Sequence, residues 1–186
     1  RRLGEHVMQK GSMVSEERAL ADGFAATEHL KLSNPLTDDR VYLRRSLLPS
    51  LVEALEAMMR PVLVVFELAN VYHPQANALP TEQLHLSIVS NCEYRELRAQ
   101  VEAMLATLHI TKMRIDTESH VLTAGDHEVA IGLVSRAGSY VAFDFIWSEL
   151  LQISTTHPHY LPLPKAAPLT EDLTFTLPAQ TAVGPI

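Results

Sequence analysis

The most regular hydrophobic pattern of the chain lies between Asn34 and Tyr72. It begins with Asn34-Pro35, which predicts a turn because proline fixes its own φ and disfavours helical geometry in the residue before it. After a short strand, apolar residues recur at helical spacing and form one face, made of Leu47, Leu48, Leu51, Val52, Leu55, Met58 and Met59. The continuous apolar run over residues 62–66 then predicts a strand that is covered on both faces.

Residue types at the ends of this predicted helix indicate its limits. Ser46 is the expected N-cap, since its hydroxyl can accept a hydrogen bond from an amide of the first turn. Pro49 fits inside that turn, where its missing N–H costs no helical bond. Arg60-Pro61 is expected to end the helix.

The rest of the chain predicts three further helices and several short strands. Ser15 is placed to cap a short helix through Leu20, apolar spacing predicts a long helix over residues 94–108, and a last helix is expected at Trp147–Ile153. Residues 83–90 alternate between apolar and polar side chains, so they are expected to return as a hairpin beside the strand at 62–72. Other strands are expected at residues 6–9, 28–33, 112–116, 120–122, 129–135, 140–145 and 173–177.

This order of elements predicts an α+β fold. Strands and helices do not alternate as they do in βαβ units, and short turns join most neighbouring strands. We therefore expect a mostly antiparallel sheet flanked by helices, with the helices on one side.

The stretch from Asn34 to Tyr72 also carries a family resemblance. Asn-Pro-Leu, a polar spacer, Leu-Arg-x-Ser-Leu-Leu-Pro-x-Leu-x-Glu-x-Leu, and then a strand with Phe-Glu and Val-Tyr resemble the core of the phenylalanyl-tRNA synthetase beta subunit. The matching residues are Asn34, Pro35, Leu36, Leu43, Arg44, Ser46, Leu47, Leu48, Pro49, Leu51, Glu53, Leu55, Phe66, Glu67, Val71 and Tyr72. Residues 160–165 and 171–175 resemble the family's entry into its next domain, although Glu171 stands where the family usually has Arg.

The resemblance implies a class II aminoacyl-tRNA synthetase-like fold that has lost its chemistry. Residues 1–160 would form the non-catalytic core module, and residues 161–186 a linker and the first strand of a truncated ferredoxin-like anticodon-binding domain. In that family the catalytic alpha subunit joins phenylalanine to its tRNA with ATP and Mg²⁺, within a heterotetramer. This chain itself would hold no cofactor and would contact tRNA only indirectly.

The sequence lacks the cations that a class II site needs for adenylate chemistry. Such a site holds the α-phosphate with an Arg from a strand–loop–strand hairpin. It places a second Arg over the nucleotide from a Gly-rich strand-to-helix turn, because charge builds on the phosphate in the transition state. Here no Arg occurs from Tyr72 through Ser90, and the Gly-containing stretch 131–138 leads into a predicted strand. The isolated chain is therefore expected to be inactive.

Composition narrows the remaining alternatives. The 186 residues suit one domain, or one domain with a fragment of another, and the net charge of −7 argues against a broad phosphate-binding surface. The single Cys92 cannot form an internal disulfide, which fits a cytoplasmic protein, and no apolar run of about 18 residues could span a membrane. The ends, Arg1-Arg2 and Pro185-Ile186, indicate a piece of a longer polypeptide or a processed chain.

Two other constellations have simpler explanations. The nine histidines, among them His157 and His159, match no metal-ligand spacing, so no metal site is expected. Cys92 with His85 or His109 would make a thiol–imidazole pair, but a half-buried structural residue is favoured.

Two features leave alternatives open. Arg44 either contacts substrate, tRNA or a partner chain, or it forms a salt bridge to Glu67 or to Asp38/Asp39. The salt bridge is favoured, and Arg45 is expected to be exposed. The apolar face of the 47–59 helix is expected to be core, but its two adjacent methionines widen it, so Leu55, Met58 and Met59 are an interface candidate.

Two functional hypotheses follow. The first is a structural module of the beta subunit that supports assembly with the catalytic alpha subunit. The alternative is a freestanding synthetase-like module that binds a partner or forms a homodimer. An active ligase domain is disfavoured by the missing arginines.

Overall fold

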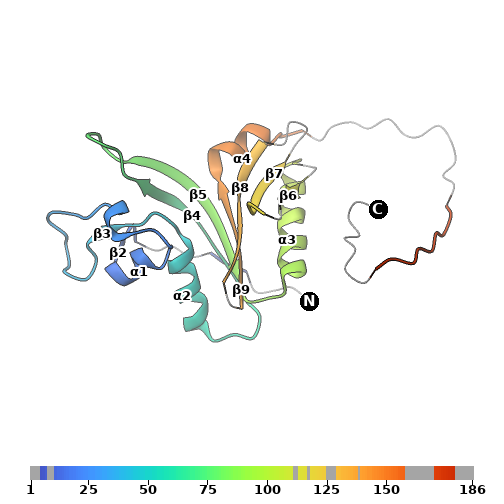
Figure 1. The fold of residues 1–186 in the computed structure, drawn as a ribbon, viewed down its shortest axis with the longest axis horizontal. Helices are drawn as coiled ribbons and strands as arrows, with labels where there is room; N and C mark the ends of the chain where they lie inside the picture. Colours follow the sequence, from blue (N-terminus) through green and yellow to red (C-terminus); the bar gives the residue numbers. More distant parts are fainter. Residues whose placement is uncertain are drawn as a thin grey trace.

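The computed structural model describes residues 5–7, 11–110, 113–116, 118–124, 129–137, 139–157 and 170–178. In this part of the chain a large sheet has the strand order β1-β4-β5-β9-β8-β7-β6 (Figure 1). The strands from β4 to β9 pair antiparallel, and β1 joins β4 in parallel. The predicted α+β class is thereby confirmed.

The elements have the following limits. The sheet strands are β1 (Glu5–Val7), β4 (Val64–His73), β5 (Thr81–Ser90), β6 (Arg114–Ile115), β7 (Val121–Ala124), β8 (Val129–Ala137) and β9 (Tyr140–Ile146). A separate ribbon joins β2 (Met13–Val14) and β3 (Tyr42–Leu43). The helices are α1 (Glu16–Leu20), the 3₁₀ helix η1 (Ala26–Glu28), α2 (Leu48–Met58), α3 (Tyr94–Thr107) and α4 (Trp147–Ile153).

The predicted hairpin is formed by β4 and β5, which pair without interruption from Val64–Ser90 to His73–Thr81. The helix predicted at Trp147–Ile153 is confirmed, and the long helix predicted before it ends one residue early, at Thr107. Ser15 caps α1 by accepting a hydrogen bond from the Arg18 amide at 3.3 Å.

The limits of α2 differ slightly from those predicted. The N-cap position is Leu47, yet the Ser46 hydroxyl still accepts from the Leu48 amide at 3.1 Å, and Pro49 lies in the first turn. The helix ends at Met58, two residues before Arg60-Pro61, because Met59 adopts a left-handed conformation with φ 44°. Such a residue turns the chain out of the helix.

Two predicted strands are not formed. Residues 28–33 contain the end of η1 and an isolated bridge between Lys31 and Tyr42. Residues 173–177 form neither helix nor strand, and Leu173 and Phe175 are 72% and 60% exposed, since no strand of the described ranges pairs with them. Residues 8–9, 158–169 and 179–186 lie outside the described part, so the division of the chain at residue 160 stays a prediction.

Helices cover both faces of the sheet, so the expectation of helices on one side is wrong (Figure 1). On one face, Phe143 and Phe145 of β9 belong to the core cluster that includes Leu97 and Leu105 of α3 and Leu150 of α4. On the other face, α2 packs Leu47, Leu51 and Leu55 against Val65, Val71, Val89 and Ala142. Strands that are apolar on both sides, as the run at 62–66 indicates, need a cover on both sides.

No helix in the described ranges combines the length and apolar character needed to cross a membrane. Cys92, expected to be half-buried, is 6% exposed, and its thiol is free.

Gly132 lies where β8 approaches β9 too closely for a side chain. A Cβ added there would lie 2.0 Å from the carbonyl oxygen of Asp144 and 2.9 Å from the Cα of Phe145. These are backbone atoms of a paired strand, which cannot rotate away as a flexible side chain would.

We expect Gly132→Ala to lower the free energy of unfolding by about 1–3 kcal/mol, the usual cost of overpacking. Urea denaturation followed by circular dichroism measures this change. Gly11→Ala is the control, because the nearest atom to its added Cβ, the Met13 carbonyl oxygen, is 4.0 Å away. Equal stability of the two variants would contradict the close strand approach.

Candidate functional site

The candidate site lies on the face of the sheet that α2 partly covers. Glu67 of β4, Ser87 of β5 and Asp144 of β9 are register partners and form one row across three strands. Because side chains alternate along a strand, all three share the face of Val65 and Val89. The row lies beside the apolar cluster that α2 covers, so its bonding partners decide what the face can do.

Arg44 reaches this row from the segment that follows β3. Its amide donates to the Ser12 carbonyl at 3.1 Å, and its carbonyl accepts from the Tyr72 amide at 3.0 Å, so the backbone is fixed to β4. The guanidinium donates from Nη1 to Glu67 Oε1 and from Nε to the Asn70 carbonyl, both at 3.1 Å. The two charged side chains are 3% and 2% exposed. The predicted Arg44–Glu67 salt bridge is confirmed.

Asp144 holds both of its polar neighbours on β5. His85 Nδ1 lies 2.8 Å from Asp144 Oδ2, and the Ser87 hydroxyl donates to Asp144 Oδ1. In a nucleophilic Ser–His–Asp triad the serine donates to the histidine. Here serine and histidine both bond to the carboxylate, and His85 Nε2 lies 3.1 Å from Gln83 Oε1. The arrangement is a structural network rather than a nucleophile with its base.

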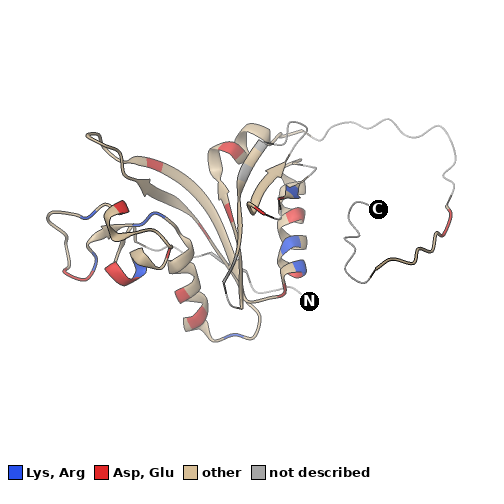
Figure 2. Ribbon diagram, in the orientation of Figure 1, with Lys and Arg blue, Asp and Glu red and all other residues tan. Residues whose placement is uncertain are grey.

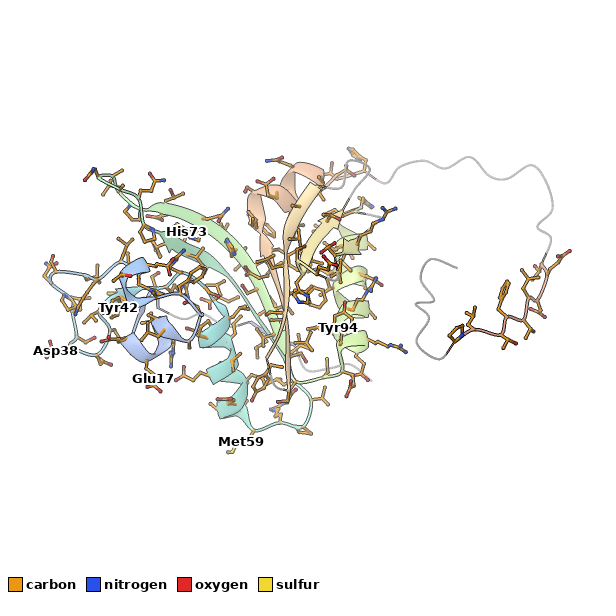
Figure 3. All side chains as sticks on the ribbon, viewed as in Figure 1. Glu17, Asp38, Tyr42, Met59, His73 and Tyr94 are labelled. Carbon is orange, nitrogen blue, oxygen red and sulfur yellow. The ribbon has the colours of Figure 1, made fainter. Side chains whose placement is uncertain are left out.

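His73 ends β4 beside this network, with its ring centroid 6.5 Å from that of His85 (Figure 3). Burial lowers the pKa of His73, and electrostatic interactions with Arg45 and His85 lower it further. The imidazole is therefore held toward its neutral form, which weakens it as an anion-binding group.

The two elements nearest to this row carry no cation that could hold a phosphate. Neither residues 64–90, which include the β4–β5 hairpin, nor residues 140–153, which include β9 and α4, contain Lys or Arg (Figure 2). The charged residues of these elements that face the row are acidic, and they are bound to Arg44 or His85.

The residues that carry the family resemblance divide between core, ion pair and loop. Leu47, Leu51 and Leu55 are in the core, and Phe66 packs partly buried against the cluster on the opposite face. Arg44 and Glu67 form the ion pair, while Ser46, Leu48 and Pro49 build the start of α2. Asn34, Pro35 and Leu36 lie in a loop, in which Leu36 is 87% exposed.

The interface candidate is reduced by the structure. Leu55 is 3% exposed and belongs to the core, and Met58 packs half-buried against the same cluster. Met59 is 89% exposed and points away from the end of α2 (Figure 3).

The expectation that Arg45 is exposed is wrong. Its side chain is 13% exposed, its guanidinium carbon lies 3.8 Å from the centre of the Phe24 ring, and Nη1 donates to the Glu28 carbonyl at 3.0 Å. The cause is tertiary, since the segment from Phe24 to Glu28 folds back over Arg45.

The sequence also did not predict a buried contact between His29 and Asp22. His29 Nε2 lies 3.0 Å from Asp22 Oδ2 and His29 Nδ1 lies 3.0 Å from the Ala25 carbonyl, with both side chains nearly inaccessible. No spacing or periodicity in the sequence predicted this contact. Within the described ranges no group of three or more His, Cys, Asp or Glu could hold a metal ion.

The strand order and the pairing of β4–β5 with β9 define a class II aminoacyl-tRNA synthetase-like fold. A crystal structure of pyrrolysyl-tRNA synthetase from Desulfitobacterium hafniense superimposes with a TM-score of 0.59 at 15% identity, over 79% of this chain and 62% of that one. A structure of PylSc, a pyrrolysyl tRNA synthetase of the same organism, gives 0.57 at 18% identity, over 80% and 60%. At these identities the likeness establishes the fold alone, and this chain spans about three-fifths of their length.

The family follows from the sequence. The family model of the phenylalanyl tRNA synthetase beta chain CLM domain matches residues 10–125, and the chain belongs to this family. A search of curated proteins finds no match.

Removing one partner of the Arg44–Glu67 pair should cost more than removing both. We expect Arg44→Met or Glu67→Leu to lower the free energy of unfolding by about 3–5 kcal/mol, because each leaves a buried charge without its partner. The double variant Arg44→Met/Glu67→Leu should lose less than either single variant. The control is Arg98→Met, whose exposed pair with Glu102 is worth about 0.5 kcal/mol. Additive losses in urea denaturation would contradict the pairing.

The imidazole of His73 should titrate below pH 6.5, the ordinary value, because burial and the electrostatic interactions with Arg45 and His85 disfavour its charged form. NMR of the ring protons measures the midpoint, and His73→Gln assigns the signal. Between the folded and unfolded pKa values the unfolded chain binds more protons, so this residue makes stability rise with pH. Arg45→Met should raise the midpoint and Arg98→Met should not. A midpoint at or above 6.5 would contradict the account.

Proposed function

We propose that this chain is a non-catalytic structural module of the phenylalanine-tRNA ligase beta subunit. It supports assembly with the catalytic alpha subunit, which uses ATP and Mg²⁺ to charge tRNA with phenylalanine in the cytoplasm. The observation that carries the proposal is the absence of Lys and Arg from residues 64–90 and 140–153 in a chain of this family. Activation of an amino acid needs cations where charge builds on the phosphates. The chain therefore has a structural role in the enzyme, and its contact with tRNA is indirect.

The polar row on the sheet supports this proposal. Arg44 is bound to Glu67, and His85 and Ser87 are bound to Asp144, so these groups satisfy one another inside the chain. A ligand would have to break these bonds before it could use any of them. Interactions of this kind stabilise the module and leave its face chemically inactive.

The surface that we assign to the alpha subunit is the apolar end of α2 and the segment that leads to β4. Met59 is 89% exposed and Val62 is 39% exposed, and Met58 lies beside them. Exposed methionines adapt to a partner surface, and neighbouring exposed apolar residues indicate an interaction site. Leu55 lies behind this surface, in the core.

Met59→Gly separates a role in assembly from a role in the fold. Glycine should raise the free energy of unfolding by about 1 kcal/mol, because a side chain is strained at the left-handed φ of 44°. The same change should weaken co-purification with a catalytic alpha subunit, because the exposed side chain is lost. His109→Gly is the matched control. It has a left-handed φ of 58° after α3 and should gain stability without loss of assembly.

The outcome also decides between the two functional hypotheses. An alpha subunit that binds wild type and the Met59→Gly variant equally would overturn the assigned surface. A chain that binds no alpha subunit but sediments as a stable homodimer would overturn the proposed function in favour of the freestanding module.

A further inference from the structure

A hollow of about 630 Å³ lies between α1, α2 and the strands β5, β9 and β8. It is separate from the exposed end of α2 and takes no part in the proposed assembly. Its size lies within the range of small-molecule sites, about 300–1,000 Å³.

The floor of the hollow is apolar. Leu48 and Val52 line it from α2, and Val89 and Ala142 line it from the sheet. Val89 and Ala142 are 0% and 6% exposed, so they are fixed in the core and give the floor a defined shape. A ligand would gain by placing an apolar body here.

The rim of the hollow is acidic. Glu17 of α1 and Glu53 and Glu56 of α2 line it, and α2 carries no Lys or Arg along its length (Figures 2 and 3). Among the described lining residues Arg18 is the one Lys or Arg, and it is paired with Glu53. Glu17 and Glu56 have no cationic partner in the described part of the chain.

Tyr140 fixes the position of one of these carboxylates. Its hydroxyl donates to Glu56 Oε1 at 3.0 Å, across the mouth between β9 and α2. This hydrogen bond raises the pKa of Tyr140, so the phenol keeps its proton and Glu56 keeps a donor beside its negative charge. The carboxylate is thereby held beside the apolar floor.

From this arrangement we propose that the hollow is a binding site for a small organic cation, a protonated amine that carries an apolar body. The body packs on Leu48, Val52, Val89 and Ala142, and the ammonium group lies between Glu17 and Glu56. An anion of the same shape is repelled by the rim, and a neutral molecule gains no ion pair. The rim therefore selects ligands by their charge, and the floor selects them by the shape of their apolar body.

Three probes with one apolar body and different head groups test this selection. They are 4-phenylbutylamine, 4-phenylbutanol and 4-phenylbutyrate, titrated into the whole chain by isothermal calorimetry, with amide NMR shifts to locate the binding. The amine should bind at least about fivefold more tightly than the alcohol, and the carboxylate more weakly than both. An amine that does not bind, or that binds no more tightly than the alcohol, would overturn the proposal.

Two pairs of variants test the location. Ser135→Phe places a bulky side chain in the hollow from an exposed position of β8 and should reduce amine affinity at least about tenfold. Leu133→Phe is its control, since Leu133 is exposed on the same strand, two residues away, and outside the lining. Equal effects of the two would place the binding elsewhere.

Charge is tested in the same way. Glu17→Gln/Glu56→Gln should weaken the amine about fivefold and leave the alcohol unchanged. The control Glu96→Gln/Glu102→Gln removes two carboxylates from α3 instead. If the control variant weakens the amine as much, net charge rather than the rim is responsible, and the proposal fails.

Discussion

The buried pair between Arg44 and Glu67 is the interaction on which the candidate face depends. It joins the segment after β3 to the middle of β4, and the same arginine holds the Asn70 carbonyl, so loop and hairpin share one position. Burying two charges is costly unless each satisfies the other, and this pair has both the geometry and the additional hydrogen bond. The start of α2 follows directly from Arg44, which places the apolar face of that helix on the sheet.

The pairing of charged groups within the chain also explains why a synthetase-like fold can persist without synthetase chemistry. In a catalytic site, some charged side chains have no ion-pair or hydrogen-bond partner until the ligand binds. Here Arg44 is bound to the carboxylate of Glu67, and His85 and Ser87 are bound to that of Asp144. These side chains stabilise the fold, whereas in a catalytic site they would contact the ligand. This arrangement fits a scaffold within a larger enzyme.

Local patterns predicted the parts of this fold that are themselves local. The alternation at residues 83–90 and the apolar spacing at 94–108 gave the hairpin and α3, because period and burial coincide there. The strand predicted at 28–33 failed because His29 bonds back to Ala25 and Asp22 and keeps the chain turned. Arg45 and the second helical layer were missed for a related reason. Their surroundings are built by residues distant in sequence, and no spacing records them. The sequence indicated Glu67 only as one of several candidate partners of Arg44.

The central claim is that this class II-like face does not bind a nucleotide. Isothermal titration of the whole chain with ATP and Mg²⁺ tests it most directly, because it reports binding whether or not a reaction follows. The account predicts no heat of binding beyond dilution. A saturable one-to-one isotherm would show that the chain binds the nucleotide and would contradict the account.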